Sequence, residues 1–441
     1  MCRISFSTLL LGAMGLQLSA GSACAGGCDG SSILFSFNNS LFEVGVEGKL
    51  TEVVKGLKAP RDIAWAPGCS HYGFIDSGSL WVGSLHQQPS ELDIPGEVFE
   101  YAWDPDGRSI AAVVDGSACN TRSESQGLEH RGDIYLVLPF ESTIRRLTND
   151  CKSYLLGWSD EGRSMLVDRK VSLPCAPNLP ECATGDVVAL NTKLRSEATL
   201  LTAEKLREYG WSDPKLLWWD SNRGLLYVWC MASPIGGVGL VAAFQVPLGR
   251  VLWTFEAWEA TMLSTGRIGV RSRQVEDYDT TGRNWSHLYV TVRDGKVLDT
   301  YLALPSQLPE AAGPISGDGK YILWFEPDYS RQVWHLHFAT RTEPKAWTRQ
   351  LPRGFTLIDA VWTPRERAIV LAYRKSERND LIFQIWSLDP QEKVNHRVFE
   401  GTFPLPPDTD ADSLARGATV SLPGGKVKEF IPPLVLARWT R

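Results

Sequence analysis

Tyr101-Ala-Trp-Asp-Pro-Asp-Gly-Arg108 opens a unit of sequence that recurs along the chain. The apolar segment Ile110–Val114 follows it, and the phrases Gly132-Asp-Ile-Tyr-Leu136 and Arg145-Arg-Leu-Thr148 end the unit. The opening phrase has four further copies: Ala64-Trp-Ala-Pro67, Gly157-Trp-Ser-Asp-Glu-Gly-Arg163, Gly317-Asp-Gly-Lys320 and Val361-Trp-Thr-Pro364. Because self-similarity at a fixed period is the signature of repeat architectures, the repeat indicates the fold class before any single residue does.

The clearest copy predicts four strands joined by tight turns. The first strand ends at Trp103, and Asp104-Pro-Asp-Gly107 supplies a turn in which proline presets φ and glycine accepts a positive φ. The remaining strands are Ser109–Val114, Asp133–Leu138 and Thr143–Leu147. Four antiparallel strands form one blade of a β-propeller. We expect the tryptophan before the turn to pack between neighbouring blades.

The number of repeats predicts the size of the ring. The anchor positions, each just before a turn, are spaced about 50 residues apart on average, within the ~40–50 residues of a propeller blade. They are Trp65, Trp103, Trp158, Trp219, Leu263, Ile315 and Trp362. Convincing helix periodicity occurs only around Ala203–Tyr209.

Both ends of the chain contribute further strand-like segments. These are Ile33–Phe37, Leu41–Val46 and Leu50–Val54 near the N-terminus, and Ala418–Leu422, Val427–Ile431 and Leu434–Trp439 near the C-terminus. Pairing strands from both termini in one blade removes the exposed edges of an open ring. We therefore predict an all-β chain with a single closed β-propeller of four-stranded antiparallel blades over residues 26–441, with 26–58 and 402–441 in the closing blade. This gives eight blades; the alternative is seven, if the terminal strands only extend a neighbouring blade.

The N-terminus predicts a secretory signal peptide. Arg3 precedes the apolar stretch Thr8–Leu18, and small residues end at Ala23-Cys-Ala25, which favours cleavage after Ala25. The apolar stretch is too short to span a membrane, and no later segment is long enough, so no transmembrane segment is predicted. Lipidation of Cys24 is an alternative, although Gly21 stands where a lipoprotein signal normally has a large aliphatic residue.

Export makes the cysteines candidates for disulfide bonds. Cleavage after Ala25 leaves seven cysteines, so at least one is free or pairs between molecules. We predict a disulfide between Cys175 and Cys182, whose intervening loop is short and holds two prolines. A second is predicted between Cys119 and Cys151, which fall in one repeat.

The bulk composition excludes one class of partner. The 441 residues are 43% hydrophobic and 22% charged, which is ordinary for a globular protein. The net charge is −6 and no long cluster of lysine and arginine occurs, so nucleic acid is not an expected partner. We expect no cofactor.

The repeat phrase also carries a family resemblance. Trp103-Asp-Pro-Asp-Gly-Arg108, with Gly132-Asp-Ile-Tyr135 and Arg146-Leu-Thr148, resembles the WD40-like Pro-Asp repeat of TolB-type β-propellers. TolB is the periplasmic propeller of the Tol–Pal envelope system of Gram-negative bacteria, so the resemblance implies a propeller fold and a periplasmic or secreted location. TolB carries an α/β domain ahead of its propeller. Here only Gly26–Lys58 separates the signal peptide from the first anchor, and we expect that domain to be absent.

Similar propellers form the N-terminal halves of prolyl-oligopeptidase-like enzymes, whose catalytic domain needs a Gly-x-Ser-x-Gly nucleophile elbow. No such pentapeptide occurs, and the nearest phrase, Gly157-Trp-Ser-Asp-Glu161, is a repeat turn. The carboxylates of Asp104, Asp106 and Asp318 also lie in turns, where aspartate is favoured because it hydrogen-bonds to the backbone. We therefore expect no peptidase.

A histidine-bearing strand raises an alternative that involves a metal. His335-Leu-His337 places two imidazoles on one face of a strand, with Gln332 just upstream and His287 in the previous repeat. The order Gln-x-x-His-x-His resembles the manganese ligands of oligogalacturonate lyases, which are also propellers. The resemblance implies a polysaccharide lyase or hydrolase with a divalent metal at His287, Gln332, His335 and His337. The other interpretation is an ordinary half-buried strand.

The longest irregular segments are Gly116–Arg131 and Leu173–Gly185, each inserted between the second and third strands of its blade. Binding residues concentrate on loops that a rigid scaffold holds in place. We therefore predict an exported, non-catalytic β-propeller that binds a protein or a cell-envelope component through these loops. The oligomeric state is left open, and the metal-dependent propeller enzyme is the alternative.

Overall fold

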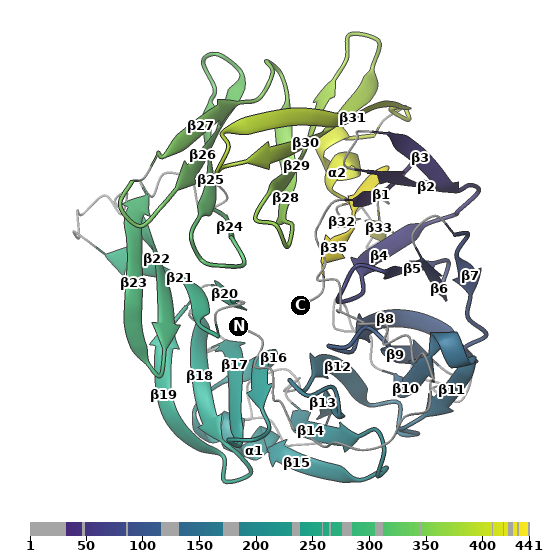
Figure 1. The fold of residues 1–441 in the computed structure, drawn as a ribbon, viewed down its shortest axis with the longest axis vertical. Helices are drawn as coiled ribbons and strands as arrows, with labels where there is room; N and C mark the ends of the chain where they lie inside the picture. The colour runs from purple at the N-terminus through teal and green to yellow at the C-terminus, as the bar shows by residue number, and fades with distance from the viewer. Residues whose placement is uncertain are drawn as a thin grey trace, which may run out of the picture.

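The computed structural model describes residues 32–45, 49–84, 87–115, 132–170, 185–231, 239–257, 259–263, 266–275, 285–304, 312–343, 345–407, 409–417, 419–421, 427–429 and 432–439. Over these residues the regular secondary structure is nearly all strand, and it forms a ring of eight blades whose strands pair antiparallel (Figure 1). This confirms the predicted fold class and the larger of the two predicted blade numbers.

Blades 1 to 4 occupy the first half of the ring. From the innermost strand outwards, blade 1 has β34 (Leu434–Leu436), β1 (Ile33–Phe37), β2 (Ser40–Val44) and β3 (Leu50–Val54). Blade 2 has β4 (Pro60–Trp65), β5 (His71–Asp76), β6 (Ser79–Ser84) and β7 (Ser90–Glu91). Blade 3 has β8 (Glu97–Trp103), β9 (Ile110–Asp115), β10 (Asp133–Leu138) and β11 (Thr143–Arg146). Blade 4 has β12 (Ser153–Trp158), β13 (Ser164–Lys170), β14 (Gly185–Asn191) and β15 (Glu197–Leu201).

Blades 5 to 8 complete the ring in the same order. Blade 5 has β16 (Ser212–Asp220), β17 (Leu225–Met231), β18 (Gly239–Gln245) and β19 (Arg250–Glu256). Blade 6 has β20 (Glu259–Met262), β21 (Ile268–Val275), β22 (Trp285–Arg293) and β23 (Lys296–Leu304). Blade 7 has β24 (Ala312–Ile315), β25 (Ile322–Asp328), β26 (Val333–Ala339) and β27 (Trp347–Gln350). Blade 8 has β28 (Thr356–Trp362), β29 (Ala368–Lys375), β30 (Asp380–Asp389) and β31 (Val394–Pro404).

The anchors of the repeat lie at the ends of innermost strands. Trp65, Trp103 and Trp158 each form the last residue of β4, β8 and β12. The Trp158 indole reaches the preceding blade, where its Nε1 donates a hydrogen bond to the Ala102 carbonyl oxygen at 3.1 Å. The same ring belongs to an apolar cluster that spans blades 3 and 4 and includes Ile134. The anchor tryptophan therefore packs between blades, as its place in the repeat predicts.

The turn after Trp103 is built by its aspartate and its glycine. Asp104 Oδ1 accepts hydrogen bonds from the backbone N–H groups of Arg108 and Ser109 at 2.7 and 3.2 Å. Gly107 has a φ of 67°, and a Cβ at this position would lie 2.7 Å from the Pro67 carbonyl oxygen in blade 2. A side chain at this residue would therefore be both strained and obstructed. The recurring phrase encodes turn formation and close packing of adjacent turns.

Both termini close the ring. β34 pairs antiparallel with β1, with Leu436 opposite Phe35. The next strand, β35 (Arg438–Trp439), pairs parallel with β4 and adds a fifth strand to blade 2. β32 (Thr419–Ser421) and β33 (Val427–Glu429) pair with each other as a separate hairpin, and β31 belongs to blade 8. Among the C-terminal strands described, β34 is the one that lies in blade 1.

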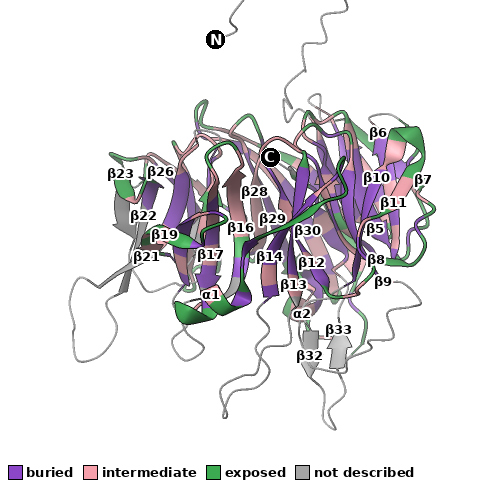
Figure 2. Ribbon diagram, turned by 90° about the horizontal axis from the view of Figure 1, so that it is seen from below, coloured by how far each residue is buried: buried purple, intermediate pink, exposed green. Residues whose placement is uncertain are grey.

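Two short helices connect blades. α1 (Ala203–Glu208) begins at Thr202, whose hydroxyl oxygen accepts a hydrogen bond from the Lys205 N–H, and it confirms the predicted helix periodicity. α2 (Ala411–Arg416) follows β31 and was not predicted from the sequence. Figure 2 shows both helices on the same side of the ring. In the described part of the chain, no helix is long and apolar enough to span a membrane.

Candidate functional site

The two predicted binding loops interrupt neighbouring blades at the same place. One joins β9 to β10 in blade 3, and the other joins β13 to β14 in blade 4. Each therefore connects a second strand to a third strand, as predicted. Most of both predicted loops, residues 116–131 and 171–184, lies outside the described residues. The structure describes the strand ends from which they leave and to which they return.

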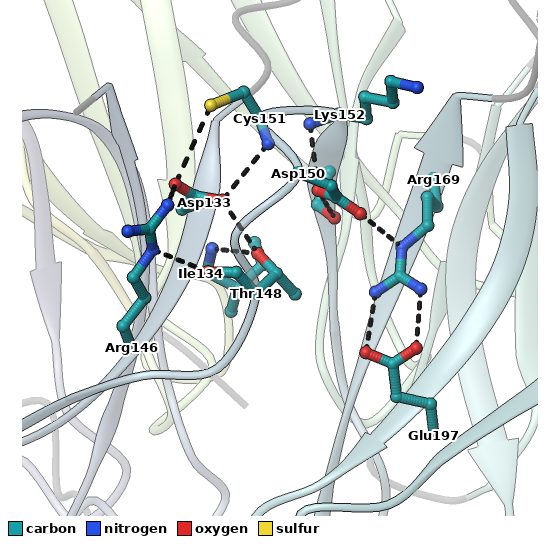
Figure 3. A network of polar contacts seen from close by, with 10 residues as sticks. Asp133, Ile134, Arg146, Thr148, Asp150, Cys151, Lys152, Arg169 and Glu197 are labelled. Carbon is teal, nitrogen blue, oxygen red and sulfur yellow. Dashed lines mark hydrogen bonds and ion pairs between the residues drawn. The ribbon is translucent and has the colours of Figure 1, made fainter. Parts of the chain in front are cut away.

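The first loop returns to the fold at a buried carboxylate. Asp133, the first residue of β10, is 1% exposed. Its Oδ2 lies 2.5 Å from an Arg146 guanidinium nitrogen, and its Oδ1 accepts a hydrogen bond from the Cys151 N–H at 3.2 Å. The Thr148 hydroxyl oxygen accepts from the Ile134 N–H at 2.9 Å and donates to Asp133 at 3.4 Å (Figure 3). Asp133 thus ties β10, β11 and the chain after β11 together.

The second loop leaves the fold next to a bidentate ion pair. Arg169, near the end of β13, donates two hydrogen bonds to Glu197 on β15, at 2.6 and 3.0 Å. Its Nε lies 3.0 Å from Asp150 Oδ2 in the segment that links blades 3 and 4 (Figure 3). The hydrogen bond with Glu197 is the main reason that the pKa of the Arg169 guanidinium is raised, and the same bond lowers the pKa of Glu197. Arg169 and Glu197 are therefore both charged at neutral pH.

The two halves of this arrangement are continuous. Asp150 and Cys151 are neighbours in the chain, so the segment between β11 and β12 contacts Arg169 on one side and Asp133 on the other. We call the whole set the loop platform; its residues are Asp133, Arg146, Thr148, Asp150, Arg169 and Glu197. Paired charges and backbone hydrogen bonds of this kind fix the relative positions of the segments that they join. The loop platform joins the strand end to which the first loop returns with the strand end from which the second loop leaves.

The sequence analysis found the loops but not the residues that hold their ends. Asp133 and Thr148 belong to recurring phrases of the repeat, which could have suggested a structural pair. The contact of Arg169 with Glu197 has no such signal. It depends on β13 and β15 each pairing with β14.

His337 is the most enclosed of the predicted metal ligands whose side chains the structure describes. It is 3% exposed, and its Nδ1 lies 2.8 Å from the Thr348 hydroxyl oxygen. Its Nε2 lies 2.8 Å from Glu326 Oε2, and its ring stacks on Trp324 with centroids 4.1 Å apart. Burial and the nearby Lys345 ammonium lower the pKa of His337 to about 4. The imidazole is therefore neutral at pH 7, with both ring nitrogens engaged.

The other three predicted metal ligands are placed differently. His335 lies on the same face of β26, with its ring centroid 6.1 Å from that of His337. Gln332 is an exposed residue in the turn before β26, at a φ of 55°. The backbone of His287 pairs with Arg273 in blade 6, and its side chain lies outside the described part of the structure. Over the described residues no cluster of three or more His, Cys, Asp or Glu side chains is suited to a metal, and the four-residue site stays a prediction.

The predicted disulfides also stay predictions. Cys119, Cys175 and Cys182 lie outside the described residues. The Cys151 sulfur lies 3.8 Å from Asp133 Oδ2, within the loop platform. Among the described cysteines, Cys230 carries a free thiol and is buried.

Solved structures share the propeller fold with this chain. A eukaryotic initiation factor aligns with a TM-score of 0.51 and 12% identity, over 84% of this chain and 96% of that one. A prolyl endopeptidase aligns with a TM-score of 0.51 and 10% identity, over 80% of this chain and 51% of that one, so the chain spans about half the length of that enzyme. A TolB protein from Agrobacterium tumefaciens aligns with a TM-score of 0.31 and 13% identity, over 92% of this chain and 98% of that one.

These likenesses concern the fold alone, because one propeller architecture hosts many unrelated functions. Two TolB proteins are among the solved structures that align with this chain. No protein-family model matches the chain, and no curated protein matches its sequence.

Proposed function

We propose that this protein is an exported, non-catalytic β-propeller that binds a protein or another cell-envelope component in the periplasm through its two long loops. The observation that carries the proposal is the loop platform. Two long insertions leave adjacent blades, and one continuous set of ion pairs and hydrogen bonds fixes their ends. A binding surface with fixed ends loses less conformational entropy when it engages a partner, which favours recognition.

Replacing the loops tests this proposal. One variant has a short Gly-Ser linker in place of residues 117–130, and a second has the same linker in place of 172–183. A matched control replaces 233–237, the corresponding connection of blade 5. Each protein is crosslinked in its native envelope and the products are compared by mass spectrometry. We expect the first two variants to lose crosslinks that the control keeps, and all three to retain the thermal transition of the natural chain. Equal crosslinks in all three would overturn the proposal.

Export is a separate part of the proposal. Cleavage after Ala25 would leave Gly26 as the first residue, and the mass of the intact mature protein measures this directly. A mass that instead shows a lipid on Cys24 would replace soluble export by membrane anchoring. Mass mapping of proteolytic peptides, before and after reduction, tests the disulfides proposed for Cys175 with Cys182 and for Cys119 with Cys151.

The alternative of a metal-dependent polysaccharide enzyme receives less support. A metal ligand needs a free nitrogen lone pair, and His337 uses one nitrogen toward Thr348 and the other toward Glu326. Calorimetric titration with Mn²⁺ separates the two functions. Stoichiometric binding that a His335→Ala variant abolishes would support the enzyme against the binding scaffold.

A further inference from the structure

A groove on blade 7 lies far along the chain from the loop platform. It has a volume of about 540 Å³ and lies beside the end of β25, the turn after it, β26 and the segment before β27. Its main lining side chains are Glu326, Asp328, Tyr329, His335 and Lys345. This volume falls within the roughly 300–1,000 Å³ of small-molecule sites.

Glu326 offers a hydrogen-bond acceptor in a fixed position. Its Oε2 lies 2.8 Å from His337 Nε2 and 3.1 Å from the Lys345 ammonium nitrogen. The His337 imidazole is neutral, and the Thr348 hydroxyl satisfies Nδ1, so the Nε2 tautomer donates to Glu326. Both of these hydrogen bonds are accepted by the same carboxylate oxygen, Oε2. The side chain is 46% exposed, and its other oxygen is left to accept a hydrogen bond from a ligand in the groove.

Stacked side chains hold this carboxylate in place. The Lys345 ammonium lies 5.2 Å from the centroid of the Trp324 ring, and the same ring stacks on the His337 imidazole. The His335 ring in turn stacks on the His337 ring, on the same face of β26. Rigid groups lose little conformational freedom when a ligand arrives, so the acceptor is preorganised.

Tyr329 gives the groove an aromatic surface. It follows β25 directly, lines the groove and is 77% exposed. Such exposure of a large aromatic ring leaves its apolar area uncovered. A flat ring beside fixed polar groups suits a ligand with both C–H faces and hydroxyl groups.

The charges of the groove indicate which ligand fits. The carboxylates of Glu326 and Asp328 are each paired with a cation, Lys345 and Arg331, so neither of these cations is available to balance the charge of an anionic ligand. An apolar ligand would leave the polar lining without partners. We propose that this groove is a binding subsite for a neutral, hydroxyl-rich carbohydrate. The subsite is independent of the loop platform, because the two lie in different blades.

Titration with defined oligosaccharides tests the subsite. The full chain is titrated with cellotetraose and chitotetraose as neutral probes and with tetragalacturonate as an anionic probe, and binding is followed by calorimetry. We expect saturable binding of a neutral probe and none of tetragalacturonate. Tyr329→Ala should weaken binding about tenfold, because the stacking surface is lost. The matched control is Phe140→Ala, which removes another exposed ring, 53% exposed, from blade 3.

The remaining outcomes contradict the inference. Failure of both neutral probes to bind would overturn it, as would equal affinity of the Tyr329→Ala and Phe140→Ala variants. Preference for tetragalacturonate would also overturn it. Glu326→Gln adds a second test with the thermal transition as a folding control. It should weaken binding without changing the number of sites. None of these results depends on the crosslinks of the loop variants.

Discussion

Asp133 shows how one residue of the repeat fixes the point at which the first long loop returns to the fold. Its buried carboxylate pairs with the Arg146 guanidinium and accepts hydrogen bonds from the Thr148 hydroxyl and the Cys151 backbone N–H. Asp133→Ala leaves buried donors without their acceptor, and we expect it to lower the free energy of unfolding by about 2–3 kcal/mol. Asp106→Ala, at an exposed turn position, is the control and should change it by less than about 0.5 kcal/mol. Urea unfolding measures both, and equal effects would contradict the assigned role.

His337 makes stability depend on pH. Its pKa is about 4 in the folded chain, whereas the ordinary value is 6.5. The unfolded state therefore binds the proton more tightly, and stability is full above pH 6.5 and falls as the pH drops toward 4. The loss amounts to ~3 kcal/mol for this buried group. Urea unfolding of the natural chain and of His337→Gln across this range checks the prediction. The variant should show a smaller slope, and equal slopes would be inconsistent with it.

At single residues, the sequence predicts the role of a residue that recurs among the copies of the repeat. It does not predict the contacts of a residue that occurs in one copy alone. The turn residues Asp104 and Gly107 act as their local pattern indicates. The contact of His337 with Glu326 depends on the register between β25 and β26, which places His337 opposite Trp324 and His335 opposite Glu326. Alternation along a strand gives the face of a side chain but not its cross-strand neighbour.

The closing strand β34 is the element on which the ring depends most directly. It supplies the innermost strand of blade 1, and Leu434, Leu436 and the following Ala437 are buried. Removing residues 432–441 takes these side chains from the core and exposes the edge of β1. We expect a loss of at least on the order of 5 kcal/mol of stability. A chain that lacks only residues 440–441 is the control. Thermal unfolding of the two truncations should differ clearly, and coincident transitions would argue against closure by β34.

Elements with local signals were predictable, and elements set by distant contacts were not. The three strands near the N-terminus lie within two residues of the bounds predicted from the sequence, because local pattern and fold agree there. α2 was missed although it has an aspartate cap at Asp410 and a glycine at Gly417, since so short a helix has little periodicity. The separate hairpin of β32 and β33 was unpredictable for another reason. Their alternation fits a blade strand equally well.

On the scale of the whole molecule, the repeat determines the propeller ring. The two long loops that interrupt the repeat in blades 3 and 4 determine where the proposed binding surface lies. The eight blades follow from counting anchors and adding one blade that both ends of the chain share. The positions of the two long loops follow from the same count. The loop platform cannot be predicted from this count. Its contacts join blades 3 and 4 through the segment between β11 and β12, which belongs to neither blade.

Site-specific photo-crosslinking tests binding through the loops most directly. A benzophenone amino acid is placed at Ser123 and Leu179 in the two loops, and at Asp106 and Asn222 in short turns that join first strands to second strands. The turn and the loop of blade 3 lie at opposite ends of β9, so the two sets of probes sample different surfaces. The account predicts that, in the native envelope, the two loop positions yield one common crosslinked product that neither turn position yields. Crosslinks from the turns with none from the loops would contradict it.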